Sequence, residues 1–189
     1  VFREVCRFQR DTMERGDELL PVSVNLSRAS IHHSGVVERY VEIVKEYGIP
    51  PSCVPIELTE TATLYNEQIR KFTDMLVNEG FRLHMDDFGS GYSSLNMLKD
   101  IPIDVLKIDQ GFLREDTDSE RQRAIFAAIA QMASKLQIKI VVEGVETLEN
   151  VEMMREYGCF IAQGYYYAKP MDRAAFEKLL EVGKICPEK

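Results

Sequence analysis

The stretch RLHMDDFGSGYSSL, residues Arg82–Leu95, joins a short apolar run to two adjacent aspartates and a loop rich in glycine and serine. The apolar run predicts a buried strand that ends near Asp86 and Asp87. A strand end that only caps a helix needs one acidic side chain. Two like charges side by side raise each other's pKa unless a cation compensates them, so this arrangement favours a cation site.

Short β-rich runs alternate with longer helical patterns along the rest of the chain, and this alternation predicts an α/β protein with a parallel sheet. The runs are apolar on both faces, as expected of a sheet covered by helices or closed into a barrel. The first 20 residues resemble the middle or the end of an amphipathic helix. The predicted strands lie within residues 19–27, 53–60, 81–87, 103–109, 138–144 and 160–167, and the later helices within 35–48, 65–80, 119–137, 147–158 and 172–184.

Each predicted strand carries a polar residue near its carboxyl end. A doubly wound sheet concentrates its site at one crevice, whereas a barrel gathers polar residues from many strands around one mouth. We therefore expect a (β/α)8-type barrel formed by residues 1–189 as one domain. About six of the usual eight parallel strands are present, and we expect the missing pair before Val1. The polar strand ends are Asn25, Glu57, Asp86, Lys107, Glu143 and Gln163.

Four carboxylates, those of Glu57, Asp86, Asp87 and Glu143, would converge in such a mouth. They cannot all remain ionised there without compensation, and a divalent metal ion is the usual one. Oxygen ligands without histidine or cysteine suit Mg²⁺, Mn²⁺ or Ca²⁺ rather than Zn²⁺. Adjacent aspartates can serve two metal ions, the arrangement typical of in-line displacement at phosphorus.

Two further charged groups suit hydrolysis. Lys107 is a cation on an apolar strand, where it could hold a nucleophilic water or offset charge on a phosphoryl oxygen. Glu143 or Glu146 could accept the proton of that water.

Structural roles compete with these functional ones. Lys107 could instead pair with a carboxylate inside the barrel, and His84 is expected to pack in the interior. His32 and His33 are expected in a solvated loop, and Tyr165–Tyr167 as packing residues. The acidic residues Glu60, Asp109 and Glu146 could each cap the following helix.

Composition bears on the class of ligand, the cellular compartment and membrane attachment. The net charge of −8 argues against binding to duplex nucleic acid, where Lys and Arg must neutralise phosphates. The four cysteines show no metal or redox spacing and suit a reducing compartment, so we expect a cytoplasmic protein. No run is long and apolar enough to span a membrane, so any membrane attachment is expected only through segments upstream of Val1.

The motifs VSVNLS, IELTE, MDDFGSGYSSL, LKID, VVEGVET and QGYYYAKP resemble, in order and spacing, the EAL-domain family of cyclic di-GMP phosphodiesterases. The resemblance implies a modified TIM (β/α)8-type barrel that hydrolyses cyclic di-GMP to pGpG with Mg²⁺ or Mn²⁺ at a two-metal site. It also implies a homodimer in which the loop after Asp87 takes part. Lys107 would hold the attacking water, Glu143 would be the general base, Glu60 would anchor the loop, and Glu146 and Asp109 would support the site. The implied metal ligands are Asn25, Glu57, Asp86, Asp87, Glu143 and Gln163.

The sequence contains no Glu-Ala-Leu run. We expect this family motif, with one more metal-ligating glutamate, on a strand upstream of Val1, so that the chain is an N-terminally truncated EAL domain and by itself inactive. The alternative is a domain that binds cyclic di-GMP without cleaving it. Exposed sheet edges also predict self-association.

Overall fold

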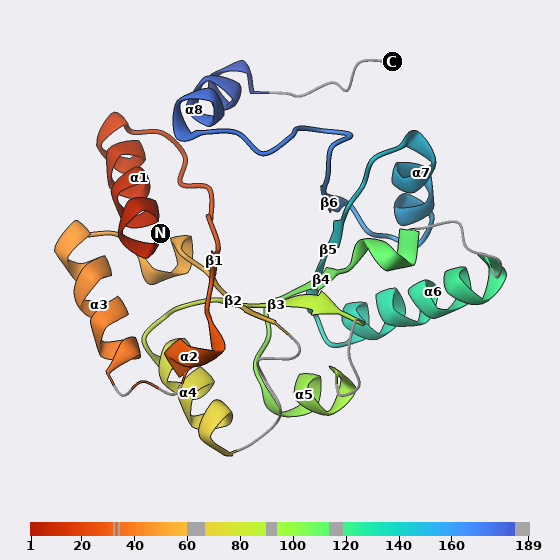
Figure 1. Cartoon of the computed structure of the whole chain (residues 1–189), viewed down its shortest axis with the longest axis horizontal. Helices are drawn as coiled ribbons and strands as arrows, with labels where there is room; N and C mark the ends of the chain where they lie inside the picture. Colours follow the sequence, from red (N-terminus) through yellow and green to blue (C-terminus); the bar gives the residue numbers. More distant parts are fainter. Residues whose placement is uncertain (32, 34, 60–66, 90–93, 114–118, 184–189) are drawn as a thin grey trace. The chain divides into compact units, whose positions relative to one another are not determined.

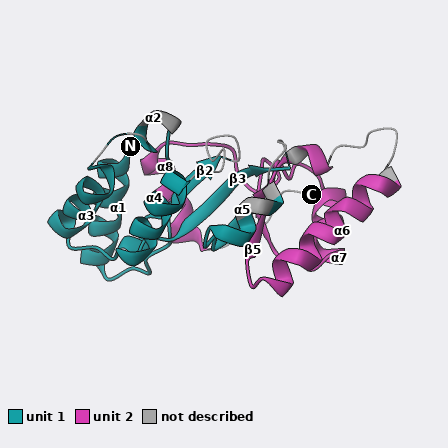
Figure 2. Cartoon of the chain, turned by 90° about the horizontal axis from the view of Figure 1, so that it is seen from below, with its two compact units in different colours: residues 1–106 teal, residues 107–189 magenta. Residues whose placement is uncertain are grey.

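The computed structural model describes the chain except for residues 32, 34, 60–66, 90–93, 114–118 and 184–189. The chain forms two compact units, residues 1–106 and 107–189, which Figure 2 shows in separate colours. The boundary falls within strand β4 (Val105–Ile108). The strands follow one another in the sheet in sequence order, from β1 to β6.

The first unit alternates short strands with helices (Figure 1). Thr73 and Leu76 of its fourth helix are buried, and Gly48 ends the third helix with a φ of 64°, which a residue with a Cβ adopts only at a cost. Its elements are α1 (Phe2–Arg15), β1 (Val24–Asn25), α2 (Arg28–Ile31), α3 (Val36–Tyr47), β2 (Ile56–Thr59), α4 (Glu67–Asn78), β3 (Leu83–Phe88) and α5 (Ser94–Asp100).

Strands β1, β2 and β3 pair in parallel, and their register positions the polar residues of the first unit. Val24 lies opposite Ile56, and Ile56 lies opposite Leu83. All three side chains are buried. Helices α1, α3 and α4 gather on one side of these strands in both views (Figures 1 and 2). Phe2 of α1 stacks on Tyr40 of α3, with ring centroids 4.0 Å apart.

The second unit has its own core. Phe126, Val142, Val145 and Met154 are buried there, and the ring of Tyr157 lies 5.6 Å from that of Phe126. Strands β5 and β6 pair in parallel. Its elements after β4 are α6 (Ser119–Lys135), β5 (Lys139–Glu143), α7 (Leu148–Glu156), β6 (Ile161–Gln163) and α8 (Arg173–Val182).

The predicted α/β class is confirmed. In the part of the chain that the structure describes, six strands in sequential order alternate with helices, which is the connectivity of an incomplete (β/α)8-type barrel. The strands are shorter than the predicted ranges, β1 and β6 most of all. β1 covers only Val24–Asn25, and β6 ends at Gln163 because the chain turns at Gly164. The expectation that all strands are buried on both faces is wrong for β5 and β6, where Lys139 and Ile161 are exposed. Among the described residues, no helix has the length and apolar character needed to cross a membrane.

Three cysteines of the described part are buried free thiols, Cys6, Cys53 and Cys159. Burial raises the pKa of Cys6 to about 12 and that of Cys159 to about 11. Because the thiolate is the reactive form, we expect both to resist alkylation by N-ethylmaleimide at pH 8 in the folded protein and to react quickly in urea. Peptide mapping by mass spectrometry measures this, and equal labelling rates in the two conditions would contradict it.

Candidate metal centre

Glu57 is a carboxylate buried in an apolar strand. It is the second residue of β2, and only 5% of its surface is exposed. The register of β1 and β2 places Asn25 directly opposite it. Ser23 Oγ donates a hydrogen bond to Glu57 Oε1 over 2.6 Å. The strand pairing thus brings an amide oxygen donor and a carboxylate together, as a hard cation requires.

Asp86 and Asp87 lie on the neighbouring strand β3. Leu83 and Met85 are fully buried and alternate with the partly exposed His84 and Asp86, so the two pairs face opposite sides of the strand. Asp87 interrupts this alternation with a φ of 56°, in the left-handed region that few residues other than glycine adopt. The strained backbone changes the direction in which the second aspartate projects, and such outliers cluster at functional sites.

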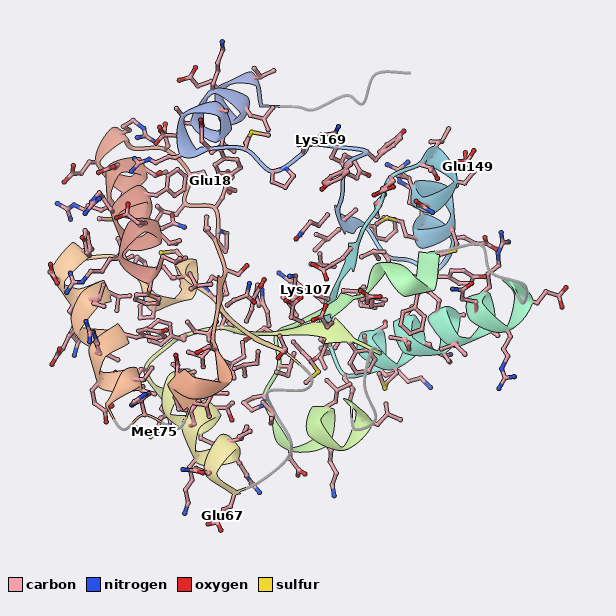
Figure 3. All side chains as sticks on the ribbon, viewed as in Figure 1. Glu18, Glu67, Met75, Lys107, Glu149 and Lys169 are labelled. Atoms are coloured by element: carbon pink, nitrogen blue, oxygen red, sulfur yellow. The ribbon has the colours of Figure 1, made fainter. Side chains whose placement is uncertain are left out.

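Lys107 and Glu143 form an ion pair in the second unit. Lys107 Nζ lies 2.9 Å from Glu143 Oε1, and their side chains are 8% and 16% exposed. Figure 3 labels Lys107 on β4. The pairing of Lys107 with a carboxylate, one of the two predicted alternatives, is confirmed. The pair places an ammonium group, which can orient a water molecule, beside a carboxylate that can accept the proton of that water.

The turn after Glu143 is held by the turn after Gln163. The register of β5 and β6 places Glu143 opposite Gln163. Val145 N donates to Gln163 O over 3.1 Å, and Tyr166 N donates to Val145 O over 3.0 Å. A Cβ at Gly164 would overlap the backbone of Val145. Glycine is therefore required in the QGY motif for the two turns to approach each other.

Replacing Gly164 by alanine is expected to lower the free energy of unfolding by about 3 kcal/mol, because a fixed backbone has to move to admit the methyl group. Gly158 is the matched control. It has a φ of 77° and open space around an added Cβ, so its replacement by alanine should cost only about 1 kcal/mol of backbone strain. Urea unfolding followed by far-ultraviolet circular dichroism compares the two. Equal losses would contradict the steric account.

The capping role predicted as an alternative for Asp109, Glu146 and Glu60 has a different outcome for each residue. Asp109 Oδ1 accepts a hydrogen bond from Gly111 N over 2.7 Å at the start of a 3₁₀ turn, which confirms a capping role. The capping interpretation is wrong for Glu146, because Thr147 is the N-cap of α7 and forms a capping box with Asn150. Glu60 lies outside the described residues, as do His32 and the loop 90–93.

The predicted positions of the histidines and tyrosines are confirmed with one exception among the described residues. His84 Nδ1 lies 3.9 Å from Glu57 Oε1, and its side chain is 17% exposed, which agrees with an interior position. His33 is exposed, as predicted. Tyr166 and Tyr167 pack against the core of the second unit, whereas Tyr165 is 57% exposed, so the packing prediction is wrong for Tyr165.

Three residues of the candidate site were missed by reasoning from the sequence. Ser23 precedes Asn25 by two positions, and the period of two in a strand places them on one face. That spacing was a usable signal, although the sequence does not reveal which carboxylate lies opposite. The steric requirement at Gly164 depends on a contact between turns. The cap at Thr147 is local, and its spacing of three residues to Asn150 was a usable signal.

The oxygen donors on the parallel strands of the first unit define an α/β protein with a candidate divalent-cation centre. The second unit contains the buried Lys107–Glu143 pair. The profile of the EAL domain matches residues 1–170, and the chain belongs to this family. The predicted resemblance is confirmed.

The chain is similar to the cyclic di-GMP phosphodiesterase NbdA of Pseudomonas aeruginosa, with 36% identity over 181 residues that cover 95% of this chain and 23% of NbdA. It spans only 20% to 25% of the lengths of the first curated relatives that it matches.

Two solved structures extend this comparison. The EAL domain of DcpA from Mycobacterium smegmatis has a TM-score of 0.88 and 31% identity, covering 97% of this chain and 83% of that one. BlrP1 from Klebsiella pneumoniae, solved in a complex with manganese and cyclic di-GMP, has a TM-score of 0.76 and 29% identity, covering 87% of this chain and 45% of that one.

Proposed function

We propose that this chain is part of an EAL domain that hydrolyses cyclic di-GMP to pGpG with Mg²⁺ or Mn²⁺. The observation that carries this proposal is the register of β1 and β2, which places Asn25 opposite the buried carboxylate of Glu57. A carboxylate in that position has to be compensated, and oxygen donors suit these cations. The named activity of NbdA and the manganese complex of BlrP1 support the same reading.

The chain's own residues divide into two groups in this proposal. Asn25, Glu57, Asp86 and Asp87 would hold the cations, with Glu143 and Gln163 completing or supporting the centre. A bound cation lowers the pKa of water and stabilises charge on the phosphoryl oxygens. This donor set fits the hard cations, because it consists of carboxylate and amide oxygens.

Hydrolysis then needs a nucleophile and a proton acceptor. Lys107 would orient the attacking water, and the carboxylate of Glu143, 2.9 Å from Lys107 Nζ, would accept its proton. The water oxygen bonds to phosphorus while the bond from phosphorus to the 3′ oxygen breaks. The 3′ oxygen takes up a proton, which leaves a 5′ phosphate on the linear product pGpG.

We also propose a ligand, an assembly state and a location for the domain. Cyclic di-GMP is the ligand expected from the family, and we propose that the domain forms a homodimer, which light scattering can test. A monodisperse monomer would contradict it. We also propose a cytoplasmic location. The Glu-Ala-Leu strand that is expected before Val1 would supply one more metal ligand, so turnover is expected of a polypeptide that includes it and not of residues 1–189 alone.

Product analysis by chromatography tests the function. Cyclic di-GMP and Mn²⁺ are incubated with the polypeptide that carries the Glu-Ala-Leu strand, with its Glu143→Ala variant and with residues 1–189. We expect pGpG only from the first. Tight binding of cyclic di-GMP without pGpG would favour the alternative, a domain that senses the nucleotide without cleaving it.

A further inference from the structure

We propose that Ser23 is a positioning residue that fixes the carboxylate of Glu57 for cation binding, an inference that rests on the proposed function. Ser23 Oγ donates to Glu57 Oε1 over 2.6 Å in a partly buried position. This distance lies in the range of short, charge-assisted hydrogen bonds between a hydroxyl group and a carboxylate. The contact is therefore one of the stronger ones available to a neutral side chain.

The backbone places Ser23 where this bond can form. Val24 N donates to Pro55 O and Leu26 N donates to Glu57 O, each over 2.9 Å. These bonds lock the segment on both sides of Asn25 against β2. Ser23 and Asn25 are two residues apart and so share a face of the strand, the face that borders Glu57.

The hydroxyl group holds one oxygen of the carboxylate in place. His84 Nδ1 is 3.9 Å from the same oxygen, Oε1, which is beyond hydrogen-bonding distance. Because a carboxylate is planar and rigid, holding Oε1 also sets the direction in which Oε2 points. Partners of this kind orient metal ligands, and losing one typically lowers metal affinity by about 10- to 100-fold.

The test is Mn²⁺ affinity, measured from the electron paramagnetic resonance signal of free Mn²⁺ with the folded polypeptide that carries the Glu-Ala-Leu strand. We expect Ser23→Ala to weaken binding by about 10- to 100-fold and Ser23→Thr, which keeps the hydroxyl group, to restore it. Ser134→Ala removes a hydroxyl group from an exposed position on α6 and should bind like the wild type. Thermal unfolding without metal is recorded for each variant.

The outcomes separate this inference from the proposed function. A wild-type protein that binds no Mn²⁺ would overturn the proposed function. A wild type that binds, with Ser23→Ala binding equally well, would overturn only the role of Ser23, even if the variant melts at a lower temperature. If Ser23→Ala does not fold, Ser23→Cys takes its place, because a thiol is a weaker donor. Unchanged affinity in that variant would overturn the inference as well.

Discussion

Replacing Lys107 by methionine is expected to lower the free energy of unfolding by about 3 kcal/mol, the lower end of the range for breaking a buried ion pair. Methionine keeps the volume and the apolar stem, so the loss comes from the charge. The carboxylate of Glu143 would keep its negative charge at 16% exposure without the ammonium group 2.9 Å away. That remaining exposure is the reason to expect the lower end of the range.

The matched control is Lys71, which pairs with Glu67 one turn away on α4 over 2.8 Å. Both side chains are largely exposed, and exposed pairs of this kind contribute about 0.3–0.5 kcal/mol. Lys71→Met should therefore have little effect. The sequence contains no tryptophan, so urea unfolding is followed by far-ultraviolet circular dichroism. Equal losses in the two variants would contradict the account of the buried pair.

The double variant Lys107→Met with Glu143→Gln sharpens this prediction. Replacing both members of a buried pair is often neutral or stabilising, because neither charge then has to be desolvated. We expect the double variant to unfold at a higher urea concentration than Lys107→Met alone. A double variant that is less stable than Lys107→Met would show that the two side chains contribute separately.

Replacing Glu57 by glutamine is expected to abolish stabilisation by Mn²⁺ while leaving the metal-free protein folded. Wild-type protein should gain about 2.7 kcal/mol when Mn²⁺ is present at 100 times its dissociation constant. Glutamine keeps the shape and can still accept the hydrogen bond from Ser23, but it lacks the negative charge that offsets the charge of the cation. The affinity loss should exceed the roughly 100-fold upper value for residues that only support a ligand.

Thermal unfolding with and without Mn²⁺ measures this effect, and Glu67→Gln on α4 is the control. Glu67 is a carboxylate with an 80% exposed side chain at the start of a helix (Figure 3), so its replacement should keep the metal-induced shift. A Glu57→Gln variant that Mn²⁺ still stabilises like the wild type would show that Glu57 is not a ligand.

The sequence predicted the order and type of the elements well, because the spacing of apolar residues and the glycines that end helices are local signals. Helix α3 ends at Gly48 as its pattern indicated, and the strand bearing Asp86 lies where its apolar run placed it. The length of β6 was not predictable in this way. It depends on Gly164 turning against Val145, a contact between segments about 20 residues apart.

The candidate site was predictable as a set of residue types but not as a geometry. The spacing of acidic strand ends identified Glu57 and Glu143, whereas the hydrogen bond from Ser23 depends on strand register. The left-handed backbone at Asp87 also could not be inferred, because aspartate only weakly favours that conformation. Glu146 does not cap α7 as its position suggested, because the adjacent Thr147 provides the cap. Neighbouring polar residues compete for the same helix start.

A crystal structure of the protein grown with Mn²⁺, with anomalous scattering recorded at the manganese edge, tests the central claim most directly. The account predicts anomalous peaks within metal-bonding distance of carboxylate oxygens of Glu57, Asp86 and Asp87 and of the amide oxygen of Asn25. Density confined to other acidic residues, or no density at Glu57 under saturating Mn²⁺, would contradict it.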